Sequence, residues 1–424
     1  MILKRALYGI GLATITTVLV ACGSDDPSRG TVVAVTETAA VPAAGVDAIV
    51  ASMPGLDQLI GAPSSCDVSI EKVVYDTIGP KGGSTKASAG LMIPSGDNCP
   101  GPYPVLVYHH GTTVYQAFTM SDPTNGEAGL QMAFFAAHGY VVVMPDYLGY
   151  GESTTYHPYL NAENTAAVSI DALRAARTTL TKKLVATNGK LFLAGYSQGG
   201  HAAMATQRTM ERDYPSEFAI TAAVDMSGPY ALSASFLGAL DAPGQGASVF
   251  FTMGLVGMEK AYGDVYAKPE DVFQAPYVTG IETLIPGALS TTELYTLGKL
   301  PLALTGDNGL LTASFVTAYK ASADFPARKN VAKSDLLNWK PVAHLELCGG
   351  ERDPTVGFAN AQGASAYFAT QQVTVPVVDV EQIPSFQPSI AAQVAANPDL
   401  STYHGTIVPP LCMSYAKNWV FAAF

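Results

Sequence analysis

Gly195-Tyr196-Ser197-Gln198-Gly199 follows the apolar run 191–194 and precedes a stretch, 200–212, whose composition suits a helix. A Gly-x-Ser-x-Gly sequence between a strand and a helix is typical of a nucleophile elbow, in which the serine occupies a strained turn and the glycines let the backbone fold back. This chain has 40 glycines, so a Gly-x-Ser-x-Gly sequence can occur in it by chance. The expected strand before it and the expected helix after it are the reasons to interpret it as a nucleophile elbow. The pattern predicts that Ser197 is a nucleophile.

The segments around this motif predict an α/β fold. Two segments in which apolar and polar residues alternate predict an antiparallel hairpin. They are followed by continuous apolar runs, which are typical of buried parallel strands. The expected strands are 67–77, 86–93, 105–108, 140–144, 191–194, 220–226, 342–347 and 373–380, and the expected helices are 127–138, 164–180, 198–214, 358–370 and 410–422. We therefore expect a mostly parallel eight-stranded sheet flanked by helices.

The strand pattern stops for about 110 residues and is replaced by apolar residues at helix-like spacing. We expect a helical cap at 231–340, inserted after the sixth strand, and an α/β core formed by 46–230 and 341–424. Within the cap, the most apolar stretch is 249–258. We interpret this stretch as the cap's own core, with a substrate-facing surface as the alternative.

The N-terminal residues predict export. Residues 1–21 combine a basic start with an uncharged stretch that is short for a membrane span and typical of a signal peptide. Leu19-Val20-Ala21-Cys22 looks like a bacterial lipobox, which implies cleavage before Cys22 and lipidation of its sulfur; a simple secretory signal with an incidental cysteine is the alternative. We expect a flexible tether at 22–45 and attachment to a bacterial outer membrane or cell surface. A periplasmic or secreted protein is the alternative location.

The charge excludes one class of partner. Removal of the signal peptide deletes Lys4 and Arg5 and no acidic residue, so the formal charge changes from −12 to −14. Such a surface repels nucleic acid, and we expect no nucleic-acid partner. The oligomeric state stays open.

Four cysteines remain besides Cys22, namely Cys66, Cys99, Cys348 and Cys412. An even number in an exported protein predicts disulfides. We favour Cys66 with Cys99 and Cys348 with Cys412, because each pair falls within one end of the chain. Zinc is the alternative, but no Cys-x-x-Cys or nearby histidine pair supports it. We expect no metal.

A serine nucleophile needs a base, and the base needs a carboxylate that orients it. In one recurrent arrangement the chain order is serine, acid, histidine. Only His404 of the seven histidines lies past the last expected strand. The loop after the seventh expected strand contains Glu351 and Asp353, and Asp225 at the end of the sixth is a further candidate acid.

Two backbone amides should stabilise the oxyanion of the tetrahedral intermediate. One is that of Gln198, which follows the nucleophile. We assign the other to Thr112, in the loop after 105–108, with Gly111 as the permissive turn. We interpret His109 and His110 as structural side chains that hold this loop, and direct catalysis by them is the alternative.

A glycine pair after the strand 140–144 raises a different possibility. Gly149-x-Gly151 resembles the start of a dinucleotide-binding fingerprint, but Thr154 occupies the place of the third glycine. The fingerprint also belongs early in such a domain. We therefore expect a loop that shapes a pocket, and no cofactor.

Together, His110-Gly111, Pro145-Asp146-Tyr147-x-Gly149-x-Gly151, the elbow with Gly200, Asp353 and His404 look like an α/β-hydrolase. The general resemblance covers residues 65–424. Within the superfamily the chain is most similar to secretory lipases of the Candida lipase A type, because of Asp-Tyr-x-Gly-x-Gly, Gly-Tyr-Ser-Gln-Gly-Gly and the cap after strand six. The family pattern of Asp-x-x-Val after a glycine-rich turn favours Asp353 as the acid, with Asp225 as the runner-up.

The resemblance implies an enzyme that hydrolyses acyl esters, lipids among them, with a helical cap over its site. The lipobox departs from those secreted lipases. We therefore expect a serine carboxylic-ester hydrolase acting on a small-molecule or lipid ester, with Ser197, Asp353 and His404 as the triad. One alternative is a peptidase of the prolyl-oligopeptidase type, although about 60 upstream residues cannot build the propeller that such enzymes carry. The other is a surface lipoprotein that binds acyl ligands without catalysis.

Overall fold

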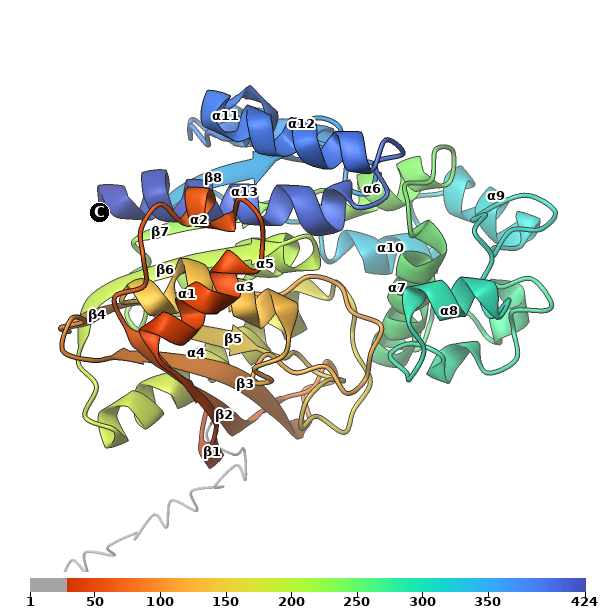
Figure 1. Cartoon of the computed structure of the whole chain (residues 1–424). Coiled ribbons are helices and arrows are strands. Elements are labelled where there is room, and N and C mark those ends of the chain that lie inside the picture. Colours follow the sequence, from red (N-terminus) through yellow and green to blue (C-terminus); the bar gives the residue numbers. More distant parts are fainter. Residues whose placement is uncertain (1–28) are drawn as a thin grey trace, which may run out of the picture.

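A nine-stranded sheet forms the centre of the molecule (Figure 1). The computed structural model describes residues 29–424. The strand order is β1-β2-β3-β5-β4-β6-β7-β8-β9, with antiparallel pairing from β1 to β5 and parallel pairing from β5 to β9. The strands are β1 Val32–Val41, β2 Asp67–Ile78, β3 Ser84–Ser95, β4 Tyr103–His109, β5 Val141–Pro145, β6 Thr187–Tyr196, β7 Ala222–Met226, β8 His344–Gly349 and β9 Val377–Asp379. The mostly parallel α/β sheet predicted from the sequence is confirmed.

The count of eight strands and the length of the tether are wrong. Residues 32–41, which we expected in the tether, form β1 and pair with β2 from Val32 opposite Tyr75 to Val41 opposite Val68. The reason is the composition of this segment, in which valines and threonines favour extended backbone. The Thr38 hydroxyl also donates to the Ser121 carbonyl at 2.7 Å, which ties β1 to the loop before α3 (Gly126–Phe134). The signal peptide and Cys22 lie outside the described residues.

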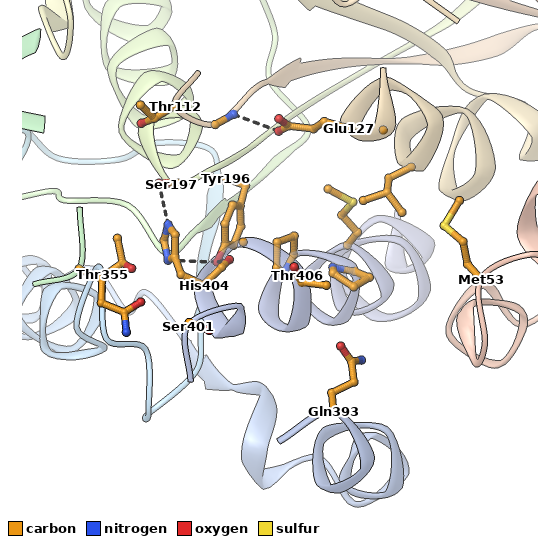
Figure 2. A pocket seen from close by; sticks show the side chains of 18 of the residues that line it. Met53, Thr112, Glu127, Tyr196, Ser197, Thr355, Gln393, Ser401, His404 and Thr406 are labelled. Carbon is orange, nitrogen blue, oxygen red and sulfur yellow. Dashed lines mark hydrogen bonds between the residues drawn. The ribbon is translucent and has the colours of Figure 1, made fainter. Parts of the chain in front are cut away.

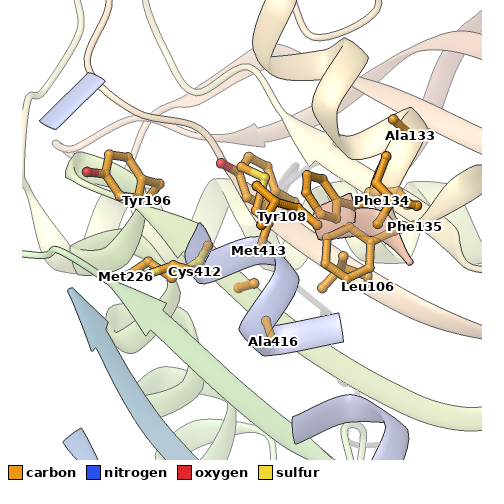
Figure 3. Packing of buried hydrophobic residues seen from close by; sticks show 14 of the residues in the cluster. Leu106, Tyr108, Ala133, Phe134, Phe135, Tyr196, Met226, Cys412, Met413 and Ala416 are labelled. Atoms are coloured by element: carbon orange, nitrogen blue, oxygen red, sulfur yellow. The ribbon is translucent and has the colours of Figure 1, made fainter. Parts of the chain in front are cut away.

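Helices cover both faces of the sheet (Figure 1). One face carries α1 Ala43–Ala51, α2 Leu56–Ile60, α3, α12 Gln387–Ala396 and α13 Val408–Tyr415, and the other carries α4 Ala162–Lys182, α5 Gln198–Asp213 and α11 Ala359–Thr370. Alternate residues of the central strands point to opposite layers. On β4, Leu106 and Tyr108 pack against Phe134 and Met413, as Figure 3 shows, whereas Val107 packs in the opposite layer. Burial on both faces explains why these strands are continuous apolar runs.

A helical insertion lies between β7 and β8. It contains α6 Leu232–Ala239, α7 Ala247–Tyr262, α8 Thr291–Thr296, α9 Ala313–Ala321 and α10 Pro326–Ala332. These helices share a hydrophobic core of their own, in which Phe236 and Phe251 lie with ring centroids 4.5 Å apart. The insertion therefore follows the sixth expected strand, which is the seventh once β1 is counted.

Two disulfides join distant segments, Cys66 with Cys99 and Cys348 with Cys412. These are the pairings that the cysteine positions favoured, and such bonds are typical of exported proteins. Within residues 29–424, no helix combines the length and the apolar character that crossing a bilayer requires.

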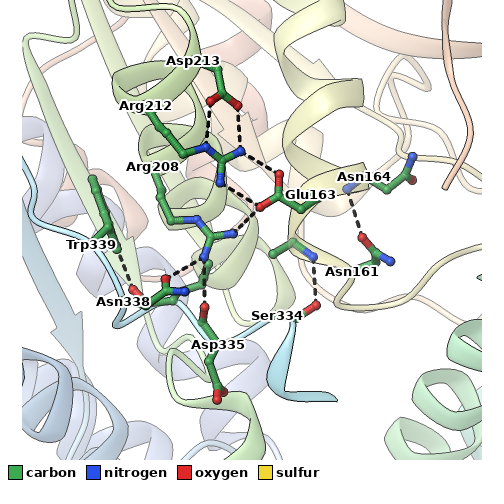
Figure 4. Close-up of polar contacts among 12 residues, drawn as sticks. Asn161, Glu163, Asn164, Arg208, Arg212, Asp213, Ser334, Asp335, Asn338 and Trp339 are labelled. Atoms are coloured by element: carbon green, nitrogen blue, oxygen red, sulfur yellow. Dashed lines mark hydrogen bonds and ion pairs between the residues drawn. The ribbon is translucent and has the colours of Figure 1, made fainter. Parts of the chain in front are cut away.

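Arg208 on α5 connects the C-terminal end of the insertion to α4 of the core (Figure 4). Its buried guanidinium donates to the carbonyl of Asp335 at 3.0 Å, to Asn338 Oδ1 at 3.1 Å and to Glu163 Oε1 at 2.9 Å. Arg212, one turn later, also pairs with Glu163, but its side chain is 48% exposed. The two arginines thus share a partner and differ in burial.

Arg208→Ala is expected to lower the free energy of unfolding by about 2 kcal/mol, because the charge-assisted hydrogen bonds of its buried guanidinium are lost. Arg212→Ala is the control, and its exposed pair should contribute below about 1 kcal/mol. Urea denaturation followed by circular dichroism measures both values. Equal effects of the two substitutions would contradict this account of Arg208.

Candidate active site

Ser197 lies in the sharp turn between β6 and α5. Its backbone has φ 58° and ψ −118°, a conformation that side-chain-bearing residues rarely adopt. A Cβ added to Gly195 would lie 2.1 Å from the carbonyl oxygen of Gly199, and one added to Gly199 would lie 1.9 Å from that of His109. Both positions therefore require glycine. The turn places Ser197 at the N-terminus of α5, beyond the carboxyl end of β6.

Three candidate residues from separate parts of the chain meet at this turn. His404 Nε2 lies 2.8 Å from Ser197 Oγ (Figure 2). His404 Nδ1 lies 2.6 Å from Asp353 Oδ2. Asp353 stands in the loop after β8, and His404 stands in a π-helical turn, Tyr403–Ile407, that leads into α13. The structure thus brings the predicted serine, histidine and acid into one hydrogen-bonded chain.

Neighbouring groups fix the acid and the imidazole. Asp353 Oδ1 accepts the backbone N–H groups of Thr355 at 2.9 Å and Val356 at 3.0 Å, which leaves Oδ2 for the histidine. The Tyr196 hydroxyl donates to the carbonyl oxygen of His404 at 2.5 Å. The Cys348–Cys412 disulfide links the end of β8 to α13, so it joins the segments that carry Asp353 and His404.

The loop after β4 carries the expected second oxyanion donor. Thr112 lines the same cavity as Ser197 and His404, and Gln198 is the first residue of α5. Within the described part of the chain, the backbone amides of Thr112 and Gln198 have no protein acceptor. An unpaired N–H at a helix N-terminus next to the nucleophile is suited to a developing negative charge.

Glu127 on α3 was missed by the sequence analysis. Its Oε1 accepts the backbone N–H of Gly111 at 3.0 Å (Figure 2). It also accepts the hydroxyl of Tyr108 at 2.8 Å. Burial raises the pKa of this carboxyl. Because Gly111 directly precedes Thr112, Glu127 fixes the peptide that orients the candidate donor. The sequence signal was weak, since an acidic residue in the first turn of a helix is common.

Two tyrosines that follow β5 donate hydrogen bonds to the loop after β4. The Tyr147 hydroxyl donates to the carbonyl of His110 at 3.1 Å, and the Tyr150 hydroxyl donates to that of Thr113 at 2.7 Å. The segment with Gly149 and Gly151 thus holds the loop that carries Thr112.

The two histidines of the loop are buried. His109 Nδ1 lies 3.0 Å from the carbonyl oxygen of Ala194. The imidazole ring of His110 stacks on the ring of Tyr147, with the two centroids 4.2 Å apart. Burial lowers the pKa of each imidazole to about 4. Neutral, packed imidazoles agree with the structural interpretation of both residues.

Comparisons with known proteins identify the superfamily and the class of reaction. A family model described as chlorophyllase matches residues 67–226. The chain is similar to a ligand-bound form of the rice cell wall degrading esterase LipA from Xanthomonas oryzae, with 32% identity and a TM-score of 0.83 over 94% of this chain and 100% of that one. The chain belongs to the α/β-hydrolase superfamily. By class it is a carboxylic-ester hydrolase.

More distant structures extend the similarity. A putative hydrolase from Legionella pneumophila has 26% identity and a TM-score of 0.75, over 82% of this α/β-hydrolase and 91% of that chain. Candida antarctica lipase A has 15% identity and a TM-score of 0.58, over 83% and 76% of the two chains. The last similarity supports the expected resemblance at the level of the fold. A search of curated proteins found no match.

Asp225, the runner-up acid of this α/β-hydrolase, makes no hydrogen bond with His404. It lies within β7, fully buried, and neither of its carboxylate oxygens has a hydrogen-bond partner in residues 29–424. Burial raises its pKa well above the usual value, which favours the neutral carboxyl in the folded protein. The hydrogen bond to His404 comes from Asp353 instead.

Asp225→Asn is expected to stabilise the protein more at pH 8 than at pH 4. The pKa of Asp225 is higher in the folded than in the unfolded protein. At a pH between these two pKa values only the folded protein binds the proton, so the stability of the wild type falls as the pH rises. Asparagine removes the dependence. Urea titrations at the two pH values measure the gain in unfolding free energy, which should be larger at pH 8 than at pH 4. A pH-independent difference would show that Asp225 is ionised.

Two cavities of this α/β-hydrolase meet at Ser197. The larger is a groove of about 1090 Å³ that also contains His404 and Thr112 and extends past Thr406 to Met53 (Figure 2). The smaller has a volume of about 100 Å³ and is formed largely by apolar side chains of the helical insertion. The reacting atom therefore faces two spaces of different size.

Proposed function

We propose that this protein is a serine carboxylic-ester hydrolase that works through an acyl-enzyme. The observation that carries the proposal is the chain of hydrogen bonds from Ser197 Oγ to His404 Nε2, at 2.8 Å, and from His404 Nδ1 to Asp353, at 2.6 Å. His404 takes the hydroxyl proton as Ser197 attacks the ester carbonyl, and then gives it to the departing alcohol. Asp353 orients the imidazole and stabilises its charged form.

The Thr112 and Gln198 amides stabilise the oxyanion of each tetrahedral intermediate. In the second half of the reaction His404 takes a proton from water, which attacks the acyl carbonyl. The bond to Ser197 Oγ then breaks, the oxygen recovers the proton, and the carboxylic acid leaves. The expected substrate is a small-molecule or lipid ester, in keeping with the similarity to a ligand-bound esterase.

Labelling with a fluorophosphonate probe tests the proposed nucleophile. We expect one covalent adduct, on the peptide that contains Ser197, and no adduct in Ser197→Ala or in heat-unfolded protein. Labelling at another residue, or none in the folded wild type, would overturn the proposal and favour a protein that binds acyl ligands without catalysis.

We also propose that the exported protein is anchored by a lipid on Cys22, a residue outside the described part of the chain. The lipobox supports this proposal, as do the two disulfides. Cys22→Ala is expected to move the protein from the membrane fraction to the soluble exported fraction and to abolish labelling by radioactive palmitate. Both are read by fractionating cells that express the full chain, with Ser24→Ala as a control. Palmitate labelling that persists in Cys22→Ala would contradict the anchor.

A further inference from the structure

We infer that the two cavities at Ser197 divide the substrate, so that the preferred esters join a short acyl chain to a large, elongated alcohol. This inference rests on the proposed function, because it uses the roles of Ser197 and His404. It adds what the chemistry alone leaves open, the size of each half of the substrate.

The position of His404 decides which half enters which cavity. His404 must give its proton to the departing alcohol oxygen, so the alcohol lies on the side of the imidazole. His404 lines the groove, whereas Gln198 lines the small cavity; within residues 29–424, neither of them lines both. The acyl chain, on the other side of the carbonyl carbon, therefore points into the small cavity.

The small cavity limits the acyl chain. Its walls are mainly Leu232 and Phe236 of α6 and Phe250 and Phe251 of α7, which accept a hydrocarbon without unpaired polar contacts. A cavity of about 150 Å³ accommodates benzene. The volume here is about 100 Å³. By that comparison the acyl chain has room for about four carbons.

The groove suits a much larger group. Its volume of about 1090 Å³ is at the upper end of the usual range for small-ligand sites. Met53, Leu56 and Met413 supply apolar surface away from Ser197, and Gln393 on α12 adds a polar side chain. Figure 2 shows Met53 at the end of the groove opposite His404. An alcohol with a long apolar body and polar substituents matches this lining.

An ester panel tests the division on the intact protein. With p-nitrophenyl esters, kcat/KM is expected to peak near a four-carbon acyl chain and to be at least tenfold lower for a ten-carbon chain. With butyrate esters, decyl butyrate is expected to exceed methyl butyrate at least tenfold. A preference for ten-carbon acyl chains, or for methyl over decyl butyrate, would overturn the inference.

Matched variants separate the cavities. Phe236→Ala enlarges the small cavity and should shift the acyl optimum to longer chains, and Ala239→Leu narrows the same cavity and should shift it toward acetate. Phe315→Ala truncates an equally buried phenylalanine of the insertion that does not line the cavity, and its acyl profile should stay that of wild type. Gln393→Trp should reduce only the preference for decyl butyrate.

The results distinguish this inference from the proposed function. Active variants of Phe236 and Ala239 with unchanged acyl profiles would overturn the inference while leaving the ester hydrolase in place. Turnover that persists in Ser197→Ala would overturn the function itself. Because one variant enlarges and the other fills the cavity, a folding failure of one leaves the other as a test.

Discussion

Ser197→Ala is expected to lower kcat for p-nitrophenyl butyrate by about 10⁵- to 10⁶-fold, the scale seen when a serine nucleophile is removed from a triad. The hydroxyl that forms the acyl-enzyme is lost, while the candidate oxyanion donors remain. Alanine also fits the strained backbone of the elbow as well as serine does, since both carry a Cβ. Initial rates at saturating substrate, with circular dichroism and thermal unfolding as controls, measure the effect. A loss below tenfold in folded protein would contradict the assignment.

Asp353→Asn is expected to lower kcat by about 10⁴-fold, because an amide at this position can hold the imidazole in the wrong tautomer. The carboxylate accepts His404 Nδ1 at 2.6 Å through one oxygen and two backbone N–H groups through the other. Asparagine keeps the size of the side chain and can still accept the backbone bonds. The loss should therefore appear in kcat with little change in the unfolding temperature.

Asp225→Asn is the matched control for that experiment. It makes the same chemical change at a buried carboxyl of the neighbouring strand that has no hydrogen bond to His404. Its kcat is expected to stay within threefold of wild type. If Asp225→Asn lost activity and Asp353→Asn kept it, the acid would be Asp225.

The fold could be predicted because its evidence is local. Each buried strand is a short apolar run. The elbow can be recognised by Gly195 and Gly199, which must be glycine because backbone carbonyl oxygens lie too close for a Cβ. β1 was missed although its valines and threonines favour extended backbone, because its formation also depends on pairing with β2, from Val41 with Val68 to Val32 with Tyr75. Edge strands with solvent on one side carry little hydrophobic signal.

The candidate site was predictable to the extent that chain order and residue chemistry constrain it. His404 followed from its place after the last strand. Three acids competed, the family pattern favoured Asp353, and in the structure the hydrogen bond to His404 comes from Asp353 and not from Asp225. Glu127, the segment 52–55 and the residues of α2 that line the groove had no sequence signature. Their positions relative to Ser197 depend on how helices from remote segments pack on the sheet.

Capture of the covalent intermediate tests the central claim most directly. Wild-type protein is mixed with excess p-nitrophenyl butyrate, quenched with acid within milliseconds, digested with protease and analysed by mass spectrometry. We predict one butyryl group on Ser197, formed together with a burst of one p-nitrophenol per active site. Turnover without any acylated peptide, or with the acyl group on a different residue, would contradict an acyl-enzyme at Ser197.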